Sequence, residues 1–407
     1  MASVLKSHRK IHVIDGGSYR RFGCNGYVCR YGEDRMARSS RSRPGRAAVD
    51  NAGKCVHFYS TIRIQSMKSR CERSVFGKTT LSIALTLACT FGAALPVAAQ
   101  TSTQTLVIFP DQGFTSIYNL INSAQKTIDM TMYELQDTTA QNDLCNAAAR
   151  GVTVRVILDV NDEKSNNTAA YDQLKDCGVN VVWAWTKYEA SHQKTITVDS
   201  ATSNAQTAIM TANLTSRYYS TSRDYAVIEN NTTDISAIEA TFAKDFAHSS
   251  VTPSNGTDLV WSPTNSQSSL LSIINNAQTS LLVENEEMSD SAIVEALENA
   301  AKAGVSVTVV MTNDDNDYAS EFNELTNAGV NISTYPDNTT SLYIHAKAIV
   351  ADYGTSAQMA FVGSENFSSA SLTKNRELGL ITTHSSILSQ LKSTMSSDYS
   401  GGTHWSD

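Results

Sequence analysis

The chain of 407 residues is long enough for one large domain or for two to three smaller ones with a substantial core. Its formal net charge of −8 conceals an uneven distribution, because residues 1–99 hold 17 of the 32 Lys and Arg but only 5 of the 40 Asp and Glu. The remaining residues hold 15 basic and 35 acidic side chains, a net charge of −20, which argues against binding nucleic acid through overall charge.

The first part of the chain differs from a folded domain. Residues 1–66 are rich in Arg and in turn-forming residues and show no sustained helix or strand period. Met67 opens a pattern typical of a secretory signal, with basic residues, an apolar run over 81–95 and small residues before Gln100. We therefore expect 1–66 to be an unstructured, over-extended reading frame and 67–99 to be a signal peptide. A basic arm for nucleic acid is the alternative interpretation of the first segment.

The predicted signal has consequences for location. Its apolar run is too short and too poorly flanked for a membrane span. We expect a secreted or periplasmic protein with no transmembrane span, and we expect it to be a monomer.

Strand and helix patterns alternate from Gln104 onward. Apolar runs and alternating runs predict strands, and apolar residues at helical spacing predict helices that end before Gly151 and Gly178. The predicted strands cover 105–109, 127–133, 152–158, 179–185 and 194–198, with helices between the first four of them. This alternation favours βαβ units and a mostly parallel sheet.

The second part of this region repeats the first at an offset of 153 positions. Leu106–Pro110 matches Leu259–Pro263, and Ile121–Gln125 matches Ile274–Gln278. A repeat of this length predicts two homologous α/β halves related by a pseudo-twofold axis, covering 100–252 and 253–407. The turn-rich segment 252–257 forms the predicted joint.

Two cysteines follow the predicted signal. Cys145 and Cys177 fall on successive predicted helices of the first half, and the second half has none at the matching positions. In an exported protein they allow a disulfide, with two buried thiols as the alternative.

The repeat also carries the residues that point to chemistry. Each half has a His-x-Lys-x-x-x-x-Asp segment on a predicted strand, followed 21 residues after the His by an Asn. The His and the Lys project to the same face of their strand, because side chains at i and i+2 share a face. The eight residues of this predicted catalytic set are His192, Lys194, Asp199, Asn213, His345, Lys347, Asp352 and Asn366.

These motifs, together with Gly363-Ser364-x-Asn366, resemble the signature of the phospholipase D superfamily, and the chain resembles a member with two motifs. The resemblance covers most of the chain after about Gln100. It implies two phospholipase D-like halves, each a mixed, mostly parallel sheet flanked by helices, and a phosphodiesterase or phosphatidyltransferase activity. The first copy departs from the signature at Met210-Thr211, so Thr211 is expected to replace the serine hydroxyl.

The resemblance also implies a route without a metal or another cofactor. One His attacks phosphorus to form a phosphohistidine, and the other protonates the leaving alcohol and then activates water or an acceptor alcohol. By resemblance His192 is the nucleophile and His345 the acid and base. The lysines and asparagines are expected to hold the phosphoryl oxygens, with supporting roles for Thr211, Ser364, Asp224 and Glu377.

Within these sets the expected roles differ. Asp224 and Glu377 are expected to orient the imidazoles through their second nitrogens. Asp199 and Asp352 are expected to fix strand ends rather than to touch substrate. Tyr133 and Glu286 occupy matching positions at strand ends that face the predicted cleft, where either would shape substrate choice; simple packing is the alternative for Tyr133.

Three classes of function remain open from the sequence. The first is a secreted phospholipase D that acts on phospholipids or other phosphodiesters, and the second is a secreted nuclease of the same family. The third is a catalytically silent binding module, which the intact motifs in both halves disfavour. The acidic charge of the predicted mature chain favours a phospholipid over nucleic acid. Head group, and hydrolysis versus transfer, stay open.

Overall fold

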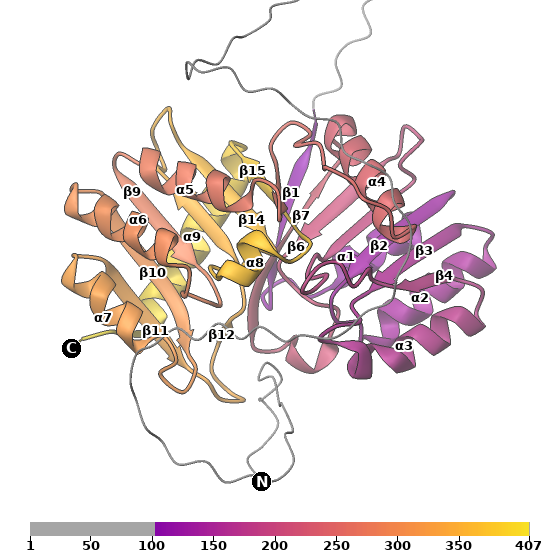
Figure 1. The fold of residues 1–407 in the computed structure, drawn as a ribbon, viewed down its shortest axis with the longest axis horizontal. Helices are drawn as coiled ribbons and strands as arrows, with labels where there is room; N and C mark the ends of the chain where they lie inside the picture. The colour runs from indigo at the N-terminus through magenta and orange to yellow at the C-terminus, as the bar shows by residue number, and fades with distance from the viewer. Residues whose placement is uncertain (1–101, 407) are drawn as a thin grey trace, which may run out of the picture. The chain divides into compact units, whose positions relative to one another are not determined.

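The computed structural model describes residues 102–406, and the predicted segments 1–66 and 67–99 lie outside the described residues. Among residues 102–406, no helix combines the length and the apolarity that a bilayer crossing requires. The described residues form two similar halves, which Figure 1 shows in indigo to magenta and in orange to yellow.

The first half follows the predicted alternation of strands and helices. Its strands are rich in Val, Ile and Met and are buried over most of their length, as expected where helices cover the sheet. The elements are β1 (Gln104–Phe109), α1 (Thr115–Ser123), β2 (Thr127–Met132), α2 (Thr138–Ala149), β3 (Thr153–Leu158), α3 (Lys164–Asp176), β4 (Asn180–Trp183), β5 (Thr195–Val198), β6 (Gln206–Met210), a short 3₁₀ helix (Ser216–Tyr218), β7 (Ser222–Glu229) and α4 (Thr232–Phe246).

The second half repeats this order, adds the two short strands β12 (Tyr343–Ile344) and β16 (Thr403–His404), and has a longer last helix. The elements are β8 (Leu259–Ser262), α5 (Ser266–Asn276), β9 (Ser280–Glu284), α6 (Ser291–Lys302), β10 (Ser306–Asn313), α7 (Ala319–Asn327), β11 (Asn331–Pro336), β12 (Tyr343–Ile344), β13 (Ala348–Ala351), β14 (Met359–Gly363), α8 (Ser369–Thr373), β15 (Glu377–Thr382), α9 (Ser385–Gly401) and β16 (Thr403–His404).

Each half contains one mixed sheet flanked by helices, as predicted, but most strand pairs are antiparallel, so the prediction of mostly parallel pairing is wrong. The first sheet runs β1-β7-β6-β5-β2-β3-β4, and the second runs β16-β11-β10-β9-β13-β14-β15-β8. In these two strand orders, the parallel neighbours are β2-β3-β4 in the first sheet and β9-β10-β11 in the second. Strand β5 pairs antiparallel with β6, and β13 with β14, each pair joined by a turn. Strands β7 and β15 also pair antiparallel with the strands before them, across longer connections that hold a short helix.

Helix boundaries match their sequence signals at both ends. Asp137 caps α2 by accepting hydrogen bonds from the amides of Thr139 and Ala140. Gly151 and Gly304 follow the matching helices α2 and α6 with φ of 88° and 93°, the left-handed conformation that favours glycine. Both helices therefore end at the glycine that precedes the next strand, as the sequence predicts.

Each half has an apolar core of its own, and a third apolar core joins the two halves. It combines residues of β1, β6, β7 and α4 with residues of β8, β13, β14, β15 and α9, including Tyr225, Trp261 and Met395. Helix α9 packs against β1 of the first sheet and against β9 and β10 of the second. The halves therefore share one buried interior, and their interface is a fixed part of the fold.

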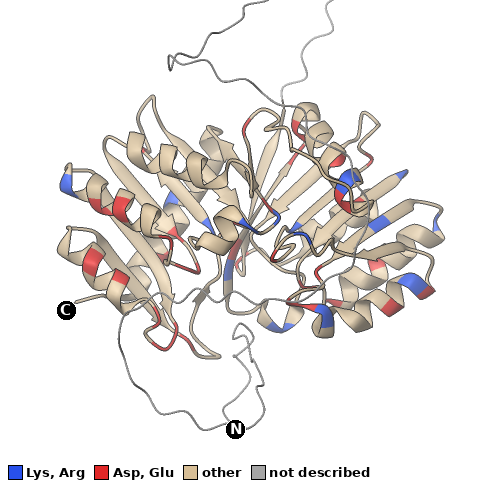
Figure 2. Cartoon of the chain, viewed as in Figure 1, with Lys and Arg blue, Asp and Glu red and all other residues tan. Residues whose placement is uncertain are grey.

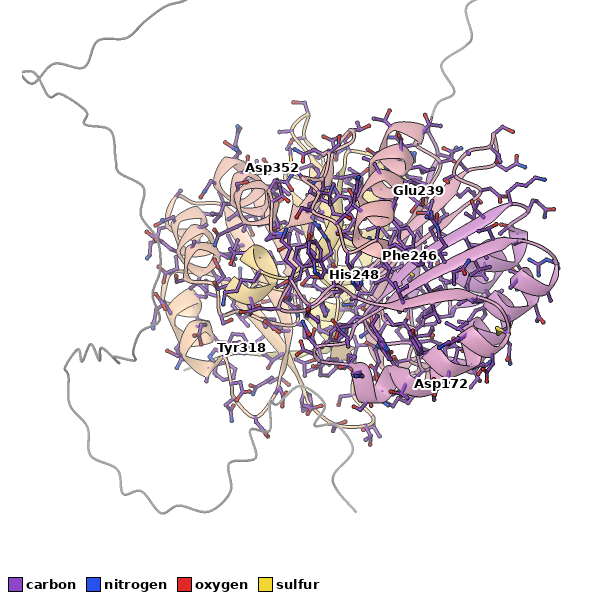
Figure 3. The ribbon with its side chains drawn as sticks, turned by 45° about the vertical axis from the view of Figure 1, so that its right-hand side comes forward. Asp172, Glu239, Phe246, His248, Tyr318 and Asp352 are labelled. Carbon is purple, nitrogen blue, oxygen red and sulfur yellow. A yellow bond between two sulfur atoms is a disulfide. The ribbon has the colours of Figure 1, made fainter. Side chains whose placement is uncertain are left out.

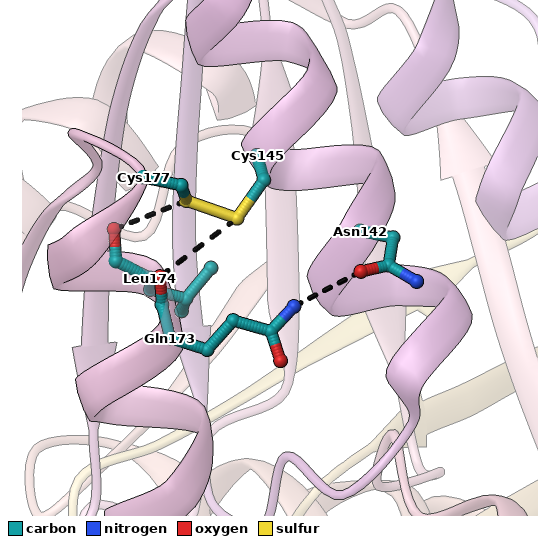
Figure 4. The surroundings of a disulfide bond; sticks show 5 residues. All are labelled: Asn142, Cys145, Gln173, Leu174 and Cys177. Carbon is teal, nitrogen blue, oxygen red and sulfur yellow. Dashed lines mark hydrogen bonds between the residues drawn. A yellow bond between two sulfur atoms is a disulfide. The ribbon is translucent and has the colours of Figure 1, made fainter.

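The structure settles the question that the two cysteines left open. Cys145 on α2 and Cys177 at the end of α3 form a disulfide (Figure 4). Gln173 Nε2 also donates to Asn142 Oδ1 at 3.0 Å between the same two helices. The bond closes a loop over a sequence separation of 32 residues. The chain-entropy model assigns a loop of this size a stabilisation of about 3–4 kcal/mol.

Glycine is required at one place in the second sheet. Gly363 and Gly379 are cross-strand partners on β14 and β15, and a Cβ on either would overlap the Phe361 ring and the Glu365 carboxylate. The matching pair in the first half is Met210 and Ala226. The larger residues fit there because Ala208 and Ala212 stand where the second half has Phe361 and Glu365.

This packing predicts an energetic coupling between Gly379 and Phe361. Gly379→Ala is expected to lower the free energy of unfolding by about 1–3 kcal/mol, because the added methyl group overpacks the core. In a Phe361→Ala background, which copies the first half, the same change should cost clearly less. Urea denaturation of the four proteins measures the coupling. Equal costs in both backgrounds would contradict the overlap.

Candidate active site

Backbone pairing with the other half positions each histidine motif. Ser191 forms a parallel bridge with Arg376, immediately before β15. At the matching place β12 pairs with β7 and sets Ile344 opposite Arg223, and the amide of His345 donates to the Arg223 carbonyl at 3.2 Å. Both motifs therefore lie at the interface between the halves.

Each imidazole contacts a carboxylate of the opposite half. Nδ1 of His192 lies 2.8 Å from Oε2 of Glu377, and Nδ1 of His345 lies 2.8 Å from Oδ1 of Asp224. The carboxylates predicted to orient the histidines are thus in contact with them, and the pairing crosses between halves. A carboxylate that accepts from Nδ1–H leaves Nε2 as the reacting nitrogen.

Burial and ion pairing set the charges of this group. Burial lowers the pKa of His192 to about 4, although the charge of Glu377 opposes the shift. Burial alone would raise the pKa values of Glu377 and Asp224. The pKa of Glu377 is nevertheless lowered by His192 and Lys194, and that of Asp224 by His345. Both carboxylates are therefore charged near neutral pH.

The hydroxyls of the two Asn-containing motifs support this group from behind. Thr211 Oγ1 donates to Asp224 Oδ1 at 2.5 Å and accepts from the Tyr225 amide at 2.9 Å. Ser364 Oγ accepts from the Leu378 amide at 3.1 Å, the matching contact. Thr211 does replace the serine hydroxyl. Both hydroxyls contact the strands that carry the carboxylates.

The two lysines are completely buried beside the imidazoles. Each ammonium donates to the carbonyl of the histidine two residues earlier. Nζ of Lys194 also lies 4.9 Å from the centre of the Tyr133 ring, whereas Nζ of Lys347 lies 2.9 Å from Oε2 of Glu286. Burial and the charge of Lys347 lower the pKa of Lys194 to about 7. A lysine ammonium has three donors, so each of these can also serve a bound anion.

The motif asparagine of the second half, Asn366, lies beside Lys347 through a shared contact with Glu286. Nδ2 of Asn366 lies 3.3 Å from Oε2 of Glu286 and 3.2 Å from Oε1 of Glu287. Among the described residues, the buried Oδ1 atoms of Asn213 and Asn366 have no hydrogen-bond partner. Such unused capacity in a buried amide is uncommon and is available to a bound ligand.

The motif aspartates lie elsewhere. Asp199 and Asp352 follow the far ends of β5 and β13, both with φ of 52°, a conformation that Asp tolerates better than most residues. Asp199 accepts from the amides of 125–127 at 2.6–3.1 Å, and Asp352 from those of 278–280 at 2.7–3.2 Å. Figure 3 labels Asp352. Their inclusion in the catalytic set is therefore corrected in favour of the strand-end role.

Sequence reasoning missed a second pair of crossed contacts behind the site. Arg223 Nε lies 2.6 Å from Asp398 of α9, and Arg376 Nε lies 2.8 Å from Asp245 of α4. Asp245 and Asp398 are 153 positions apart, so the repeat offset was the available signal. These ion pairs anchor the residues directly before Asp224 and Glu377.

In the part of the chain that the structure describes, no group of three or more His, Cys, Asp and Glu side chains is arranged to hold a metal ion.

The chain resembles several solved structures at low sequence identity. Polyphosphate kinase from Porphyromonas gingivalis aligns with a TM-score of 0.57 and 14% identity over 73% of this chain and 50% of the kinase, so the chain spans half of that protein. Phosphatidylserine synthase from Haemophilus influenzae Rd KW20 aligns with a TM-score of 0.54 and 11% identity over 72% of this chain and 85% of the synthase. The phospholipase D family member Nuc from Salmonella typhimurium aligns with a TM-score of 0.34 and 24% identity over 37% of this chain and 97% of its own.

The sequence comparison identifies the family. No curated protein matches the chain. Residues 117–246 and 270–399 each match the family model described as "Cardiolipin synthase, PLD-like domain". The two matches cover more than half of the 407 residues and contain both histidine motifs. The chain therefore belongs to the phospholipase D-like family, in the form that carries two copies of the domain.

Proposed function

We propose that the chain is a secreted phosphodiesterase that hydrolyses or transfers the phosphatidyl group of phospholipids through a phosphohistidine, without a metal ion. The observation that carries the proposal is the pair of buried imidazoles, each oriented at Nδ1 by a carboxylate of the other half. Two buried lysines lie beside them. This arrangement supplies a nucleophile, a proton carrier and positive charge for a phosphoryl group.

The first step forms a phosphorus–nitrogen bond. Nε2 of His192 attacks phosphorus, the bond to the leaving alcohol breaks, and His345 gives that oxygen a proton from Nε2. A pKa of about 4 keeps His192 unprotonated at neutral pH, as a nucleophile requires. Glu377 stabilises the positive charge that the phosphorylated ring acquires.

The second step returns the histidines to their starting states. His345 takes a proton from water or from an acceptor alcohol, the oxygen attacks phosphorus, and the bond to His192 breaks. Lys194 and Lys347 offset the charge on the non-bridging oxygens in both steps. The choice between water and alcohol decides between hydrolysis and transfer.

Charge supports a lipid rather than a nucleic acid as substrate. Residues 100–407 carry a formal net charge of −20, and Figure 2 marks acidic residues on helices and loops of both halves. A polyanion is repelled by such a surface, whereas a zwitterionic head group loses little.

The disulfide supports export. Disulfides persist in oxidising compartments, and the bond between Cys145 and Cys177 fits the secretory signal that the sequence predicts for 67–99.

The mechanism predicts activity that survives chelation and needs both histidines. Phosphodiesterase activity should persist in EDTA, and His192→Ala and His345→Ala should each lower kcat by about 10³-fold or more, because each removes one partner of both steps. His384→Ala, at an exposed position, is the control. With a p-nitrophenyl ester, His345→Ala should release a burst of nitrophenol and leave His192 phosphorylated. Loss of activity in EDTA that magnesium or zinc restores would contradict the proposal.

The two pKa values predict the pH dependence of kcat/KM. His192 must be unprotonated to attack, so the rate should fall as pH drops below about 4. Lys194 must be protonated to hold a phosphoryl oxygen, so the rate should fall as pH rises through about 7. A profile from pH 3 to 10 on a soluble diester measures both limbs. A basic limb near the ordinary pKa of lysine would contradict the effect of burial.

The substrate prediction compares a lipid with DNA. Release of choline from micellar phosphatidylcholine should exceed nicking of plasmid DNA at physiological salt and in EDTA, because the acidic surface repels the polyanion. Both assays use one preparation of enzyme. Rapid nicking without release of choline would favour the nuclease instead.

A further inference from the structure

One pair of matched positions at the site differs in charge between the halves. Tyr133 follows β2 in the first half, and Glu286 stands 153 positions later, shortly after β9. The buried Tyr133 ring packs edge-on against the His192 ring, with 4.5 Å between their centres. The second half therefore places a carboxylate where the first half has an aromatic ring.

The Glu286 carboxylate makes contacts on the reacting side of His345. Its Oε2 atom lies 3.6 Å from Nε2 of His345, 2.9 Å from Nζ of Lys347 and 3.3 Å from Nδ2 of Asn366. The Tyr343 hydroxyl donates to Oε1 at 3.2 Å. The side chain is 10% exposed, so it lies at the edge of the buried group.

Further hydrogen-bond acceptors and negative charge lie near Glu286, on the Nε2 side of His345. Oε1 of Glu287 lies 3.2 Å from the same Asn366 amide, and Oδ1 of Asn366 is a buried acceptor without a partner among the described residues. The carboxylates also face Tyr318, whose phenol pKa they raise together with burial. Figure 3 labels Tyr318 in the second half. A group with a positive charge and N–H donors complements this environment.

We propose that Glu286 is a specificity-determining residue that favours phosphodiesters whose leaving alcohol carries a positive charge, such as ethanolamine or choline. The inference rests on the proposed function, because it takes His345 as the acid that protonates the leaving oxygen.

The dimensions of such a leaving group fit. An ester oxygen that receives a proton from Nε2 of His345 lies within about 3 Å of that nitrogen. The ammonium of ethanolamine stands two carbons further, roughly 3–4 Å from the oxygen. Glu286 Oε2, at 3.6 Å from the same Nε2, is therefore within reach of the ammonium.

Glu286 has a second possible effect on binding, besides recognition of the ammonium. Glu286 contacts Lys347 and Asn366, the two groups of the second half that are expected to hold phosphoryl oxygens. As a competitor for those groups it would weaken the binding of every phosphodiester, whatever the charge of its leaving group. Only recognition of the ammonium depends on the leaving group.

Two short-chain lipids that differ in one atom provide the test. Dihexanoyl phosphatidylethanolamine and dihexanoyl phosphatidylpropanol have leaving groups of nearly equal size, and only the first carries a charge. Release of dihexanoyl phosphatidic acid gives kcat/KM for both lipids with the native chain, Glu286→Gln and Glu295→Gln. Glu295→Gln removes the same charge from an exposed position on α6 and serves as the matched control.

The native chain and Glu295→Gln should prefer the ethanolamine lipid, and Glu286→Gln should lower the ratio of the two kcat/KM values by about tenfold. An unchanged ratio overturns the inference, whether both rates rise, as for a competitor of the phosphoryl group, or both fall, as for a structural residue. If the native chain cleaves neither lipid but nicks plasmid DNA, the proposed function fails instead.

Discussion

The exchange of buried carboxylates between the two halves is the constraint on which this site depends. A buried imidazole that must carry a positive charge during a reaction requires a counter-charge, because burial disfavours the charged form. The carboxylate at each Nδ1 comes from the opposite half: Asp224 reaches His345, and Glu377 reaches His192. The apolar core between the sheets fixes the distance of these contacts. A half without its partner would therefore lose the orientation of its imidazole.

The repeat offset made much of this predictable from the sequence. Together with the local patterns it predicted two halves, the order of strands and helices up to Val198, and the residues of both motifs. It did not predict that the carboxylates cross, because equal spacing is consistent with a contact within a half or between halves. The pairing of Ser191 with Arg376 decides between them, and it joins residues 185 positions apart. The antiparallel pairing of β5 with β2 was likewise missed, because alternation alone favours parallel strands.

The departure of the first motif from Gly-Ser has a packing explanation rather than a chemical one. In the second half the Phe361 ring and the Glu365 side chain fill the space above Gly363, and in the first half Ala208 and Ala212 leave that space to Met210. The hydroxyl that follows, from Thr211 or Ser364, makes the same backbone contact in both halves. The side-chain volume that Met210 adds in the first half is thus offset by the smaller side chains of Ala208 and Ala212. A motif comparison that considers one position at a time cannot detect this offset.

An exact twofold site would give its two histidines equal properties, but a two-step displacement needs one nucleophile and one proton carrier. The structure is unequal where the chain leaves β2 and β9. Tyr133 packs its ring against His192 and Lys194, and burial lowers the pKa of both groups. Glu286 instead places negative charge beside His345 and Lys347, where a proton is to be held. Under the proposed mechanism, this one difference assigns the nucleophile to the first half and the proton carrier to the second.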